Sequence, residues 1–428
     1  MIIIIGAGLA GLSTGYHLTL KNANFKIYEM DSIVGGLCKS ERINGFIFDY
    51  TGHLLHLHNG YVKKLLTKIL GDKLRKIKRN SWIYSNGVYT PYPFQVNLYG
   101  LPPEVIKECI IGLIKAKYTK SKKEPISFEG WIYKHLGKGI AKHFMVPYNE
   151  KLWTVPPVEM TCDWLRKYVP NPSLEEVLDG ALQPPKKDYG YNIYFSYPIH
   201  GGIETLPKVF AEHVNNIELN KRIIGIDTHK KIIELNDGKK ESYDILISTM
   251  PLPELIKAIR DVPSDIEHAS SKLNYASVRN INLGVKRQKL SEKHWIYFPE
   301  KEFIFYRAGF MSNFSPNMAP KDMSSIYVEI SYSKNKPINE KNTFERVVED
   351  LVKCNILRPT DEIVAKCQLD IKYAYVIYDK SYREIVGMIH NYLKNIDIYS
   401  IGRFGKWEYS AMEDAIFEGK EVADKLVD

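Results

Sequence analysis

Cysteine is scarce in this sequence. The 428 residues contain only Cys38, Cys109, Cys162, Cys354 and Cys367. An odd number of widely spaced cysteines, with no CxxC pair, argues against a disulfide framework and against a zinc site. This pattern favours a reducing environment, so we expect a cytoplasmic protein.

A long apolar run is also missing. The apolar N-terminus, from Met1 to Leu12, has no basic region ahead of it and is broken by Gly6, Gly8 and Gly11. A membrane span needs roughly 18 or more apolar residues. We therefore predict no membrane insertion, and this stretch favours a strand followed by a turn.

The sequence has no acidic excess. Lys and Arg number 59 against 50 Asp and Glu, which gives a formal net charge of +9. The basic residues are scattered apart from a run at 115–123, and no zinc spacing, helix-turn-helix pattern or RNP-like string accompanies that run. We predict a solvated helix end or loop there and no nucleic-acid partner. The positive charge suits a phosphorylated substrate better.

Length and composition indicate an ordinary globular protein of two or three domains, with 44% hydrophobic and 25% charged residues. The first thirty residues predict a βαβ unit, with a buried strand at 2–5, a helix at 9–20 and a second strand at 25–29.

Further along, helical and strand-like regions alternate. Helical periodicity at 105–116 and 128–135, with breakers at Pro147, Pro156 and Pro170, predicts a helical insertion. A β-meander is predicted at 222–228, 231–235 and 243–248. The next region has predicted strands at 280–285, 304–310, 325–331 and 371–378 around one helix near 344–354. The chain ends with a predicted strand at 396–401, the segment 402–405 and a C-terminal helix.

A glycine motif follows the first predicted strand. Gly6, Gly8 and Gly11 form GxGxxG between a strand and a helix, the context in which this pattern predicts a dinucleotide site. The first glycine allows a tight turn, the second lets a pyrophosphate approach, and the third permits close helix packing. Glu29 ends the second strand, where it can accept hydrogen bonds from a ribose. A glycine-rich turn with a surface glutamate is the weaker alternative.

Two features favour FAD over NAD. A second glycine pair, Gly35 and Gly36, follows Glu29, and the segment 245–251 has the pattern of a late strand that closes over a flavin nucleotide. We therefore predict an α/β fold with an FAD-binding Rossmann-like domain, a helical insertion domain and an antiparallel β-sheet domain. The predicted segments are 1–90, 191–275 and 391–428 for the FAD-binding domain, 91–190 for the helical insertion, and 276–390 for the sheet and substrate domain.

Further motifs carry a resemblance to a known family. They are FIFDYTGHLLHLH at 46–58, PYPFQ at 91–95, FMVPYNEKLWTVP at 144–156, YFP and FYRA at 297–299 and 305–308, and GRFGKWEY at 402–409. In this order they resemble UDP-galactopyranose mutases, most of all the eukaryotic-type branch, along the whole chain. Residues 412–416 instead resemble the shorter bacterial ending.

The resemblance implies an isomerase that uses its flavin without net redox change. In that family, reduced FAD attacks the anomeric carbon through N5, the nucleotide leaves, and the opened sugar recloses as the furanose. For this chain it implies conversion of UDP-galactopyranose to UDP-galactofuranose, for cell-surface polysaccharide biosynthesis, with NADPH as reductant. The protein would hold a dianionic nucleotide sugar over the flavin and neutralise its diphosphate.

On the cofactor side, the resemblance implies that His53 lies against the flavin near N5 and that Arg403 is a cofactor-side arginine. Arg79 and Ser81 match residues that hold NADPH, and His58 matches a second histidine of the His53 loop. The histidines of this loop could instead be structural or hold a metal. No carboxylate or thiolate joins them nearby in the sequence, so we expect no metal.

On the substrate side, Tyr92 and Gln95 match positions that stack on uracil and bond to it. Arg307 matches a diphosphate-binding arginine, and a guanidinium between aromatic neighbours on a predicted strand is unfavourable unless an anion pairs with it. The alternative for the aromatic residues is core packing. The other matches are Asn149 and Trp153 in the nucleotide pocket, Asn192 near the sugar, and Tyr297, Tyr375 and Tyr409 as donors to the phosphates. The predicted catalytic residues are His53, Arg307, Tyr375 and Tyr409.

One position departs from the family. Eukaryotic-type mutases carry a second diphosphate arginine where this chain has Tyr168. In a helix, Arg166 and Lys167 would point roughly 200° and 100° away from it, so neither is an obvious replacement. Tyr168 can donate one hydrogen bond but lacks the charge and the two-pronged geometry of a guanidinium. We hypothesise that the sugar or nucleotide differs somewhat from UDP-galactose, the alternative being that Lys167 is brought round to the phosphate.

Two other functions are compatible with the same flavin fold. One is an oxidase or desaturase of the amine-oxidase or protoporphyrinogen-oxidase type, and the other is a redox-inactive FAD-binding scaffold. The PYPFQ, FYRA and GRFG motifs favour the mutase, because an oxidase of apolar substrates has no need of a diphosphate arginine.

Overall fold

A five-stranded parallel sheet forms the first structural unit, in the order β19-β13-β1-β2-β9. The computed structural model describes residues 1–119, 124–165, 168–184, 188–190, 192–338 and 341–427. All four residues of the central strand β1 (Ile2–Ile5) are buried, as a strand covered on both faces requires. Its partners are β2 (Phe25–Tyr28) and β13 (Ile245–Ser248), and β9 (Ile217–Glu218) and β19 (Ile398–Ser400) form the edges.

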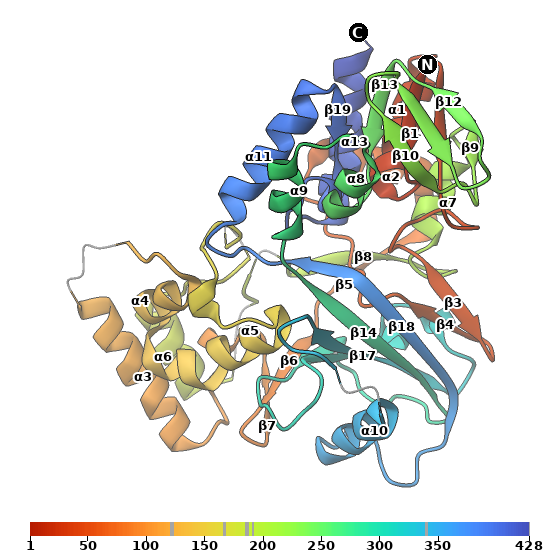
Figure 1. Cartoon of the computed structure of the whole chain (residues 1–428). Helices are drawn as coiled ribbons and strands as arrows, with labels where there is room; N and C mark the ends of the chain where they lie inside the picture. Colours follow the sequence, from red (N-terminus) through yellow and green to blue (C-terminus); the bar gives the residue numbers. More distant parts are fainter. Residues whose placement is uncertain (120–123, 166–167, 185–187, 191, 339–340, 428) are drawn as a thin grey trace.

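Helices cover both faces of this sheet, and both chain termini lie beside it (Figure 1). Ile2 and Ile4 pack into one apolar cluster, whereas Ile3 and Ile5 point into another, because successive side chains of a strand alternate between faces. The first cluster contains α1 (Leu9–Leu20), α2 (Gly60–Leu70), α7 (Thr205–Ala211) and α13 (Met412–Leu426), and the second contains α8 (Leu252–Ala258), α9 (Ser264–Ser271) and α11 (Tyr382–Asn395). The predicted Rossmann-like fold is confirmed.

One sequence prediction for this unit is corrected, and one of its helices was not predicted. The third meander strand is β12 (Lys240–Ser242), which joins β10 (Ile223–Asp227) and β11 (Ile232–Leu235). The predicted strand at 243–248 instead contains β13 of the parallel sheet, because its apolar run suits a strand buried on both faces. Helix α11 was not predicted, although its buried Ile385, Ile389 and Leu393 recur every four residues.

The second unit is helical and lies to one side (Figure 1). It contains α3 (Pro103–Tyr118), α4 (Phe128–Ile140), the π-helix η3 (Ala141–Met145), α5 (Val146–Trp153) and α6 (Leu174–Leu182). Pro147 does not break the helix as predicted, because it occupies the first turn of α5, where a missing N–H is tolerated. Lys115 and Lys117 lie exposed in the last turn of α3, and residues 120–123 fall outside the described residues.

The third unit is a seven-stranded sheet in the order β18-β14-β17-β16-β15-β6-β7. Its strands are β6 (Ser81–Ser85), β7 (Val88–Pro91), β14 (Tyr275–Val285), β15 (Trp295–Tyr297), β16 (Arg307–Gly309), β17 (Ser324–Tyr332) and β18 (Ile363–Val376). The sheet is mixed rather than purely antiparallel, because β15 pairs in parallel with β6. Of the stretch predicted as a strand at 304–310, only β16 at 307–309 is a strand in the structure. The strand predicted at 371–378 corresponds to the C-terminal end of the longer β18.

The predicted domain segments remain a proposal. Because β6 and β7 pair with the third unit, a division that follows the sheets would separate 81–90 from the FAD-binding segment 1–90 and Pro91 from the helical insertion 91–190. Helix α10 (Thr343–Lys353) packs on the outer face of this sheet. The remaining elements are the hairpin β3 (Ser40–Ile43) and β4 (Phe46–Asp49), the pair β5 (Leu74–Lys78) and β8 (Tyr194–Pro198), and the short α12 (Gly402–Gly405). No helix of the described segments is long and apolar enough to cross a bilayer.

Candidate active site

The glycine motif forms a tight cradle at the N-terminus of α1. Gly6 has φ +97°, and a Cβ on it would lie 2.2 Å from the Thr249 hydroxyl. A Cβ on Gly11 would lie 2.0 Å from the carbonyl oxygen of Gly6. Side chains are thus excluded at both positions, and the free N–H groups at the start of α1 point to a site for an anion.

A second glycine segment closes the cradle. The N–H of Gly35 donates to the carbonyl of Ala7 at 2.8 Å, and a Cβ on Gly36 would lie 3.3 Å from the Cα of Gly8. The backbones of the two segments therefore approach each other without side chains between them. This arrangement keeps side chains away from the backbone at Gly8, where the sequence predicts the pyrophosphate.

Glu29 lies immediately after β2 and beside the glycine motif. Its Oε2 accepts from the Ala7 N–H at 2.7 Å and its Oε1 from the Asp31 N–H at 2.9 Å. The carboxyl is buried, which raises its pKa. Two backbone donors fix its orientation, and its remaining lone pairs can accept from ribose hydroxyls. These residues fit the adenosine end of FAD.

Arg307 and Glu329 face each other on neighbouring strands of the large sheet. The Nε of Arg307 donates to Glu329 Oε2 at 2.9 Å, and its Nη2 donates to Oε1 at 2.7 Å. Glu329 is fully buried and also accepts from the Tyr306 hydroxyl and the Gly52 N–H. The anion that the sequence predicts beside Arg307 is thus present inside the protein.

The Glu329 contact leaves part of the Arg307 guanidinium unused. A guanidinium has five N–H groups, and the two on one edge bond to Glu329. The Arg307 side chain is 16% exposed, against 0% for Glu329. Glu329 therefore fixes the plane of Arg307, while the remaining N–H groups can bind a phosphate.

Aromatic rings surround this ion pair. The Tyr375 hydroxyl lies 3.2 Å from that of Tyr306, and burial raises the pKa of Tyr375 to about 12. The Tyr409 ring stacks on Tyr375 with centroids 6.2 Å apart, and the Arg403 guanidinium lies 4.8 Å from the Tyr409 ring centroid. Arg403 also donates to two carbonyl groups, those of Ser410 and Ala374. The structure thus brings together three of the four predicted catalytic residues and Arg403.

Four residues predicted for different parts of the ligands, the base, the sugar, the phosphates and NADPH, gather beside Arg307, which pairs with Tyr297 on the neighbouring strand. Tyr92 and Tyr297 have ring centroids 5.3 Å apart, and the Arg79 guanidinium lies 4.9 Å from the Tyr92 centroid. Arg79 donates to the side-chain oxygen of Asn192 and to the carbonyl of Tyr189 at 2.6 Å. Arg79, Tyr92, Asn192 and Tyr297, which are far apart in the sequence, therefore form one cluster.

Gln95 and Ser81 are two of the predicted site residues whose buried side chains carry a polar atom without a partner among the described residues. The Gln95 amide donates to the Pro170 carbonyl at 3.2 Å, but its Oε1 has no donor. The Ser81 hydroxyl likewise lacks a partner, and both residues are at most 5% exposed. An unpaired buried polar atom is unfavourable, so these atoms are candidates for ligand contacts.

Asn149 and Trp153 are brought together as predicted, but both are occupied by protein contacts. The Trp153 Nε1 donates to the Asn149 side-chain oxygen at 3.1 Å, and the Asn149 amide donates to the Met145 carbonyl. Trp153 is 1% exposed and its ring contacts Tyr375 and Tyr409. Trp153 therefore packs against Tyr375 and Tyr409 and helps to hold their rings in place.

His53 lies directly after Gly52, which is bonded to Glu329. Burial lowers the pKa of His53 to about 4, and its Nδ1 has no partner among the described residues. A neutral imidazole at neutral pH fits contact with a flavin better than a charged one. His58 lies elsewhere: it is exposed, precedes α2, and its backbone N–H donates to Glu413 at 2.7 Å.

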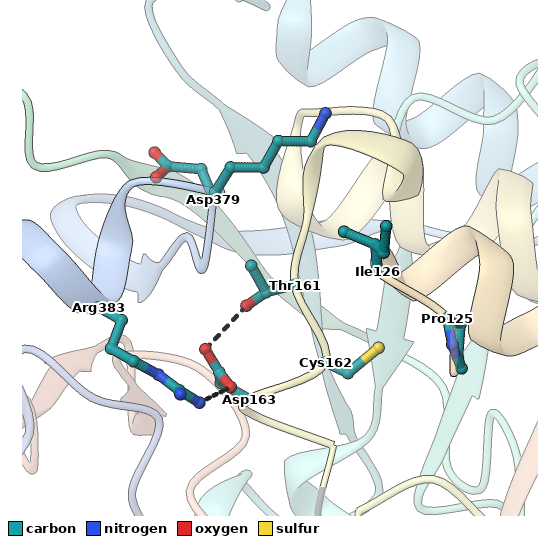
Figure 2. Close-up of a pocket in the computed structure, with 8 residues that line it drawn as sticks. Pro125, Ile126, Thr161, Cys162, Asp163, Asp379 and Arg383 are labelled. Atoms are coloured by element: carbon teal, nitrogen blue, oxygen red, sulfur yellow. Dashed lines mark hydrogen bonds and ion pairs between the residues drawn. The ribbon is translucent and has the colours of Figure 1, made fainter. Parts of the chain in front are cut away.

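The segment before Tyr168 is attached to α11 at a pocket of about 330 Å³ (Figure 2). Asp163 pairs with Arg383 at 2.5 Å and accepts from the Thr161 hydroxyl at 3.2 Å, and the Thr161 N–H donates to the Tyr378 carbonyl at 2.7 Å. Tyr168 packs edge-on against Tyr409 with centroids 5.0 Å apart. Arg166 and Lys167 lie outside the described residues.

Three residues of this site were not predicted individually. Tyr148 and Tyr306 are inside the FMVPYNEKLWTVP and FYRA motifs, next to predicted residues, and Tyr148 contacts both Tyr297 and Tyr306. Glu329 gave no signal beyond an acidic residue in an apolar strand. No group of three or more His, Cys, Asp or Glu in the described part of the chain is arranged to hold a metal.

The glycine cradle and the Glu29 carboxyl after β2 are the features of a dinucleotide-binding fold. Residues 9–366 match the family model of flavin-containing amine oxidoreductases. The chain belongs to this family, and the prediction of FAD is supported by it.

Three relatives refine the comparison. The crystal structure of a reduced UDP-galactopyranose mutase is 30% identical, with a TM-score of 0.95 over 99% of this chain and 95% of that one. A probable UDP-galactopyranose mutase of Klebsiella pneumoniae is 23% identical over 52% of this chain and 56% of its own. Protoporphyrinogen oxidase 2 of Arabidopsis thaliana is 20% identical over 91% of this chain and 86% of its own. The resemblance to UDP-galactopyranose mutases is confirmed.

Proposed function

We propose that this chain is a flavin-dependent nucleotide-sugar mutase that interconverts pyranose and furanose forms, most simply UDP-galactopyranose and UDP-galactofuranose. The observation that carries this proposal is the likeness to a UDP-galactopyranose mutase along 99% of the chain. The oxidase alternative rests on relatives of lower identity, such as the plant protoporphyrinogen oxidase, which is 20% identical. Reduced FAD would supply the nucleophile of the reaction.

The chain's own residues would bind and orient the substrate. Arg307, oriented by Glu329, would bind the diphosphate through its free N–H groups, and the hydroxyls of Tyr297, Tyr375 and Tyr409 would add further donors. Tyr92 would stack on the base, and the free Gln95 oxygen would accept from its N–H edge. Asn149 and Trp153 would support this pocket, and Asn192 would lie near the sugar.

Cofactor contacts follow from the same arrangement. The glycine cradle and Glu29 would hold the dinucleotide, with His53 and Arg403 at the flavin end. We further propose NADPH as the reductant, with Arg79 and Ser81 as its contacts; His58, exposed at the start of α2, has less support for this role. A cytoplasmic site of action and a part in cell-surface polysaccharide synthesis complete the proposal.

Activity is expected only after the flavin is reduced, by dithionite or by NADPH, because the attacking flavin atom must carry an electron pair. The test incubates reduced protein with UDP-galactopyranose and separates a furanose product by chromatography. Arg79→Ala should slow NADPH-driven reduction more than dithionite-driven turnover. Full turnover with oxidised FAD in air would rule out this mechanism, and oxygen consumption without an isomer would favour the oxidase.

Tyr168→Arg is expected to raise kcat/KM for UDP-galactopyranose, because it adds roughly 1–2 kcal/mol of transition-state stabilisation. This is the contribution of one charge-assisted hydrogen bond. The tyrosine packs on Tyr409 inside the aromatic cluster, so an arginine there could reach the diphosphate. The measurement compares kcat/KM across several nucleotide sugars. If the wild type already prefers UDP-galactopyranose and the variant gains nothing, the idea of altered specificity is wrong.

A further inference from the structure

The positive charge of this protein is concentrated in one segment. Residues 63–79 contain eight basic residues and one acidic residue, Asp72, so they carry +7 of the net charge of +9. The expectation that basic residues are scattered outside 115–123 is therefore wrong. We name these side chains the basic track: Lys63, Lys64, Lys68, Lys73, Arg75, Lys76, Lys78 and Arg79.

The basic track is exposed and continuous along the chain. It starts on the solvent face of α2, passes through the 3-10 turn η1 (Gly71–Lys73) and follows β5. All of its members except Arg79 are exposed. Among the described residues only Lys78 has a carboxylate within ion-pair distance, Asp188 at 2.9 Å. Most of this charge is therefore available to attract anions from solution.

The basic track ends in the candidate active site. Arg79 directly follows β5 and contacts Tyr92 and Asn192, the predicted nucleotide and sugar residues. Its acceptors are neutral, an amide oxygen and a carbonyl. At about 3.3 Å per residue, Lys76 lies roughly 10 Å and Lys73 roughly 20 Å along the chain from Arg79.

The site itself has little excess charge. The charge of Arg307 is balanced by Glu329, and His53 is neutral at neutral pH because burial lowers its pKa, which leaves Arg403, with its two carbonyl acceptors, as the cation at the flavin end. Outside the cleft, a dianionic diphosphate approaching from solution therefore meets positive charge through the exposed members of the track. A cleft approached along one sign of charge raises association rates by tenfold or more.

We propose that the basic track captures the nucleotide diphosphate and steers it to Arg79 at the cleft; this inference rests on the proposed function. The track acts on the association rate and not on the chemical step. Its effect weakens with salt, because the screening length falls from about 30 Å at 0.01 M to about 10 Å at 0.1 M.

The test measures the association rate of UDP with the FAD-loaded protein by stopped-flow fluorescence. The variant Lys73→Gln/Arg75→Gln/Lys76→Gln removes three track charges outside the cleft. The matched control Lys240→Gln/Lys257→Gln/Lys394→Gln removes the same charge from exposed positions on β12, α8 and α11. Uridine, which has no phosphate, serves as the uncharged probe.

The track variant is expected to slow UDP association about tenfold at low salt, while the control changes it less than twofold. The difference should disappear at about 0.3 M salt, and uridine association, the UDP dissociation rate and kcat should not change. Equal slowing of UDP association in both triple variants, or no slowing in the track variant, would overturn the proposal that the track steers the diphosphate. Salt-dependent UDP capture without a furanose product would support the track and reject the mutase, whereas no UDP binding at all would reject both.

Discussion

Arg307→Ala is expected to lower kcat/KM roughly 30- to 900-fold, which corresponds to a loss of about 2–4 kcal/mol of transition-state stabilisation. This is the range seen when a preorganised partner of developing charge is removed. Arg307 has its plane fixed by Glu329 and keeps N–H groups free for the diphosphate. Steady-state kinetics with the reduced protein gives the value. A variant within twofold of the wild type would show that Arg307 has another role.

A second measurement separates binding from folding. Without Arg307, the carboxylate of Glu329 stays buried without its cation, which is expected to lower the free energy of unfolding by about 3–5 kcal/mol. The double variant Arg307→Ala/Glu329→Gln removes that charge. It should recover part of the stability, while kcat/KM stays as low as in the single variant. Recovery of kcat/KM in the double variant would contradict a direct role of Arg307.

Gly11→Val is expected to abolish FAD binding, so that a protein that purifies yellow becomes colourless. A Cβ at this position would lie 2.0 Å from the carbonyl oxygen of Gly6, so the cradle must open. The measurement is the ratio of flavin to protein absorbance, with circular dichroism to check that the variant is folded. Gly60→Ala is the control, because a Cβ there meets nothing within 4 Å and flavin content should stay the same. A folded Gly11→Val protein with full flavin content would show that the glycine cradle does not bind the cofactor.

The cofactor half of the site was predictable because its information is local. Gly6, Gly8 and Gly11 lie within six consecutive residues, and the β-branched run at 2–5 before them indicates a buried strand. The correction at 243–248 has the same origin, since continuous apolar residues favour a central strand over a meander edge. Helix α11 also carried a local signal in its four-residue spacing.

The resemblance supplied most individual residues of the substrate half, but not their partners. Arg307 was expected to need an anion, and the sequence offered only a substrate for that role. Strand register adds an anion of the protein itself, because Arg307 on β16 lies directly opposite Glu329 on β17. Pairing between strands depends on packing across the whole sheet, which a single sequence does not specify.

The sequence by itself determined the Rossmann-like start, the glycine cradle and the acidic residue after β2, because each depends on backbone geometry within about thirty residues. The tertiary structure alone decided that Glu329 pairs with Arg307, that Tyr306 and Tyr148 join the aromatic cluster, and that the basic track ends beside Tyr92 and Asn192. These contacts join residues from separate strands and helices, and their distances follow from how three units pack together rather than from any local pattern.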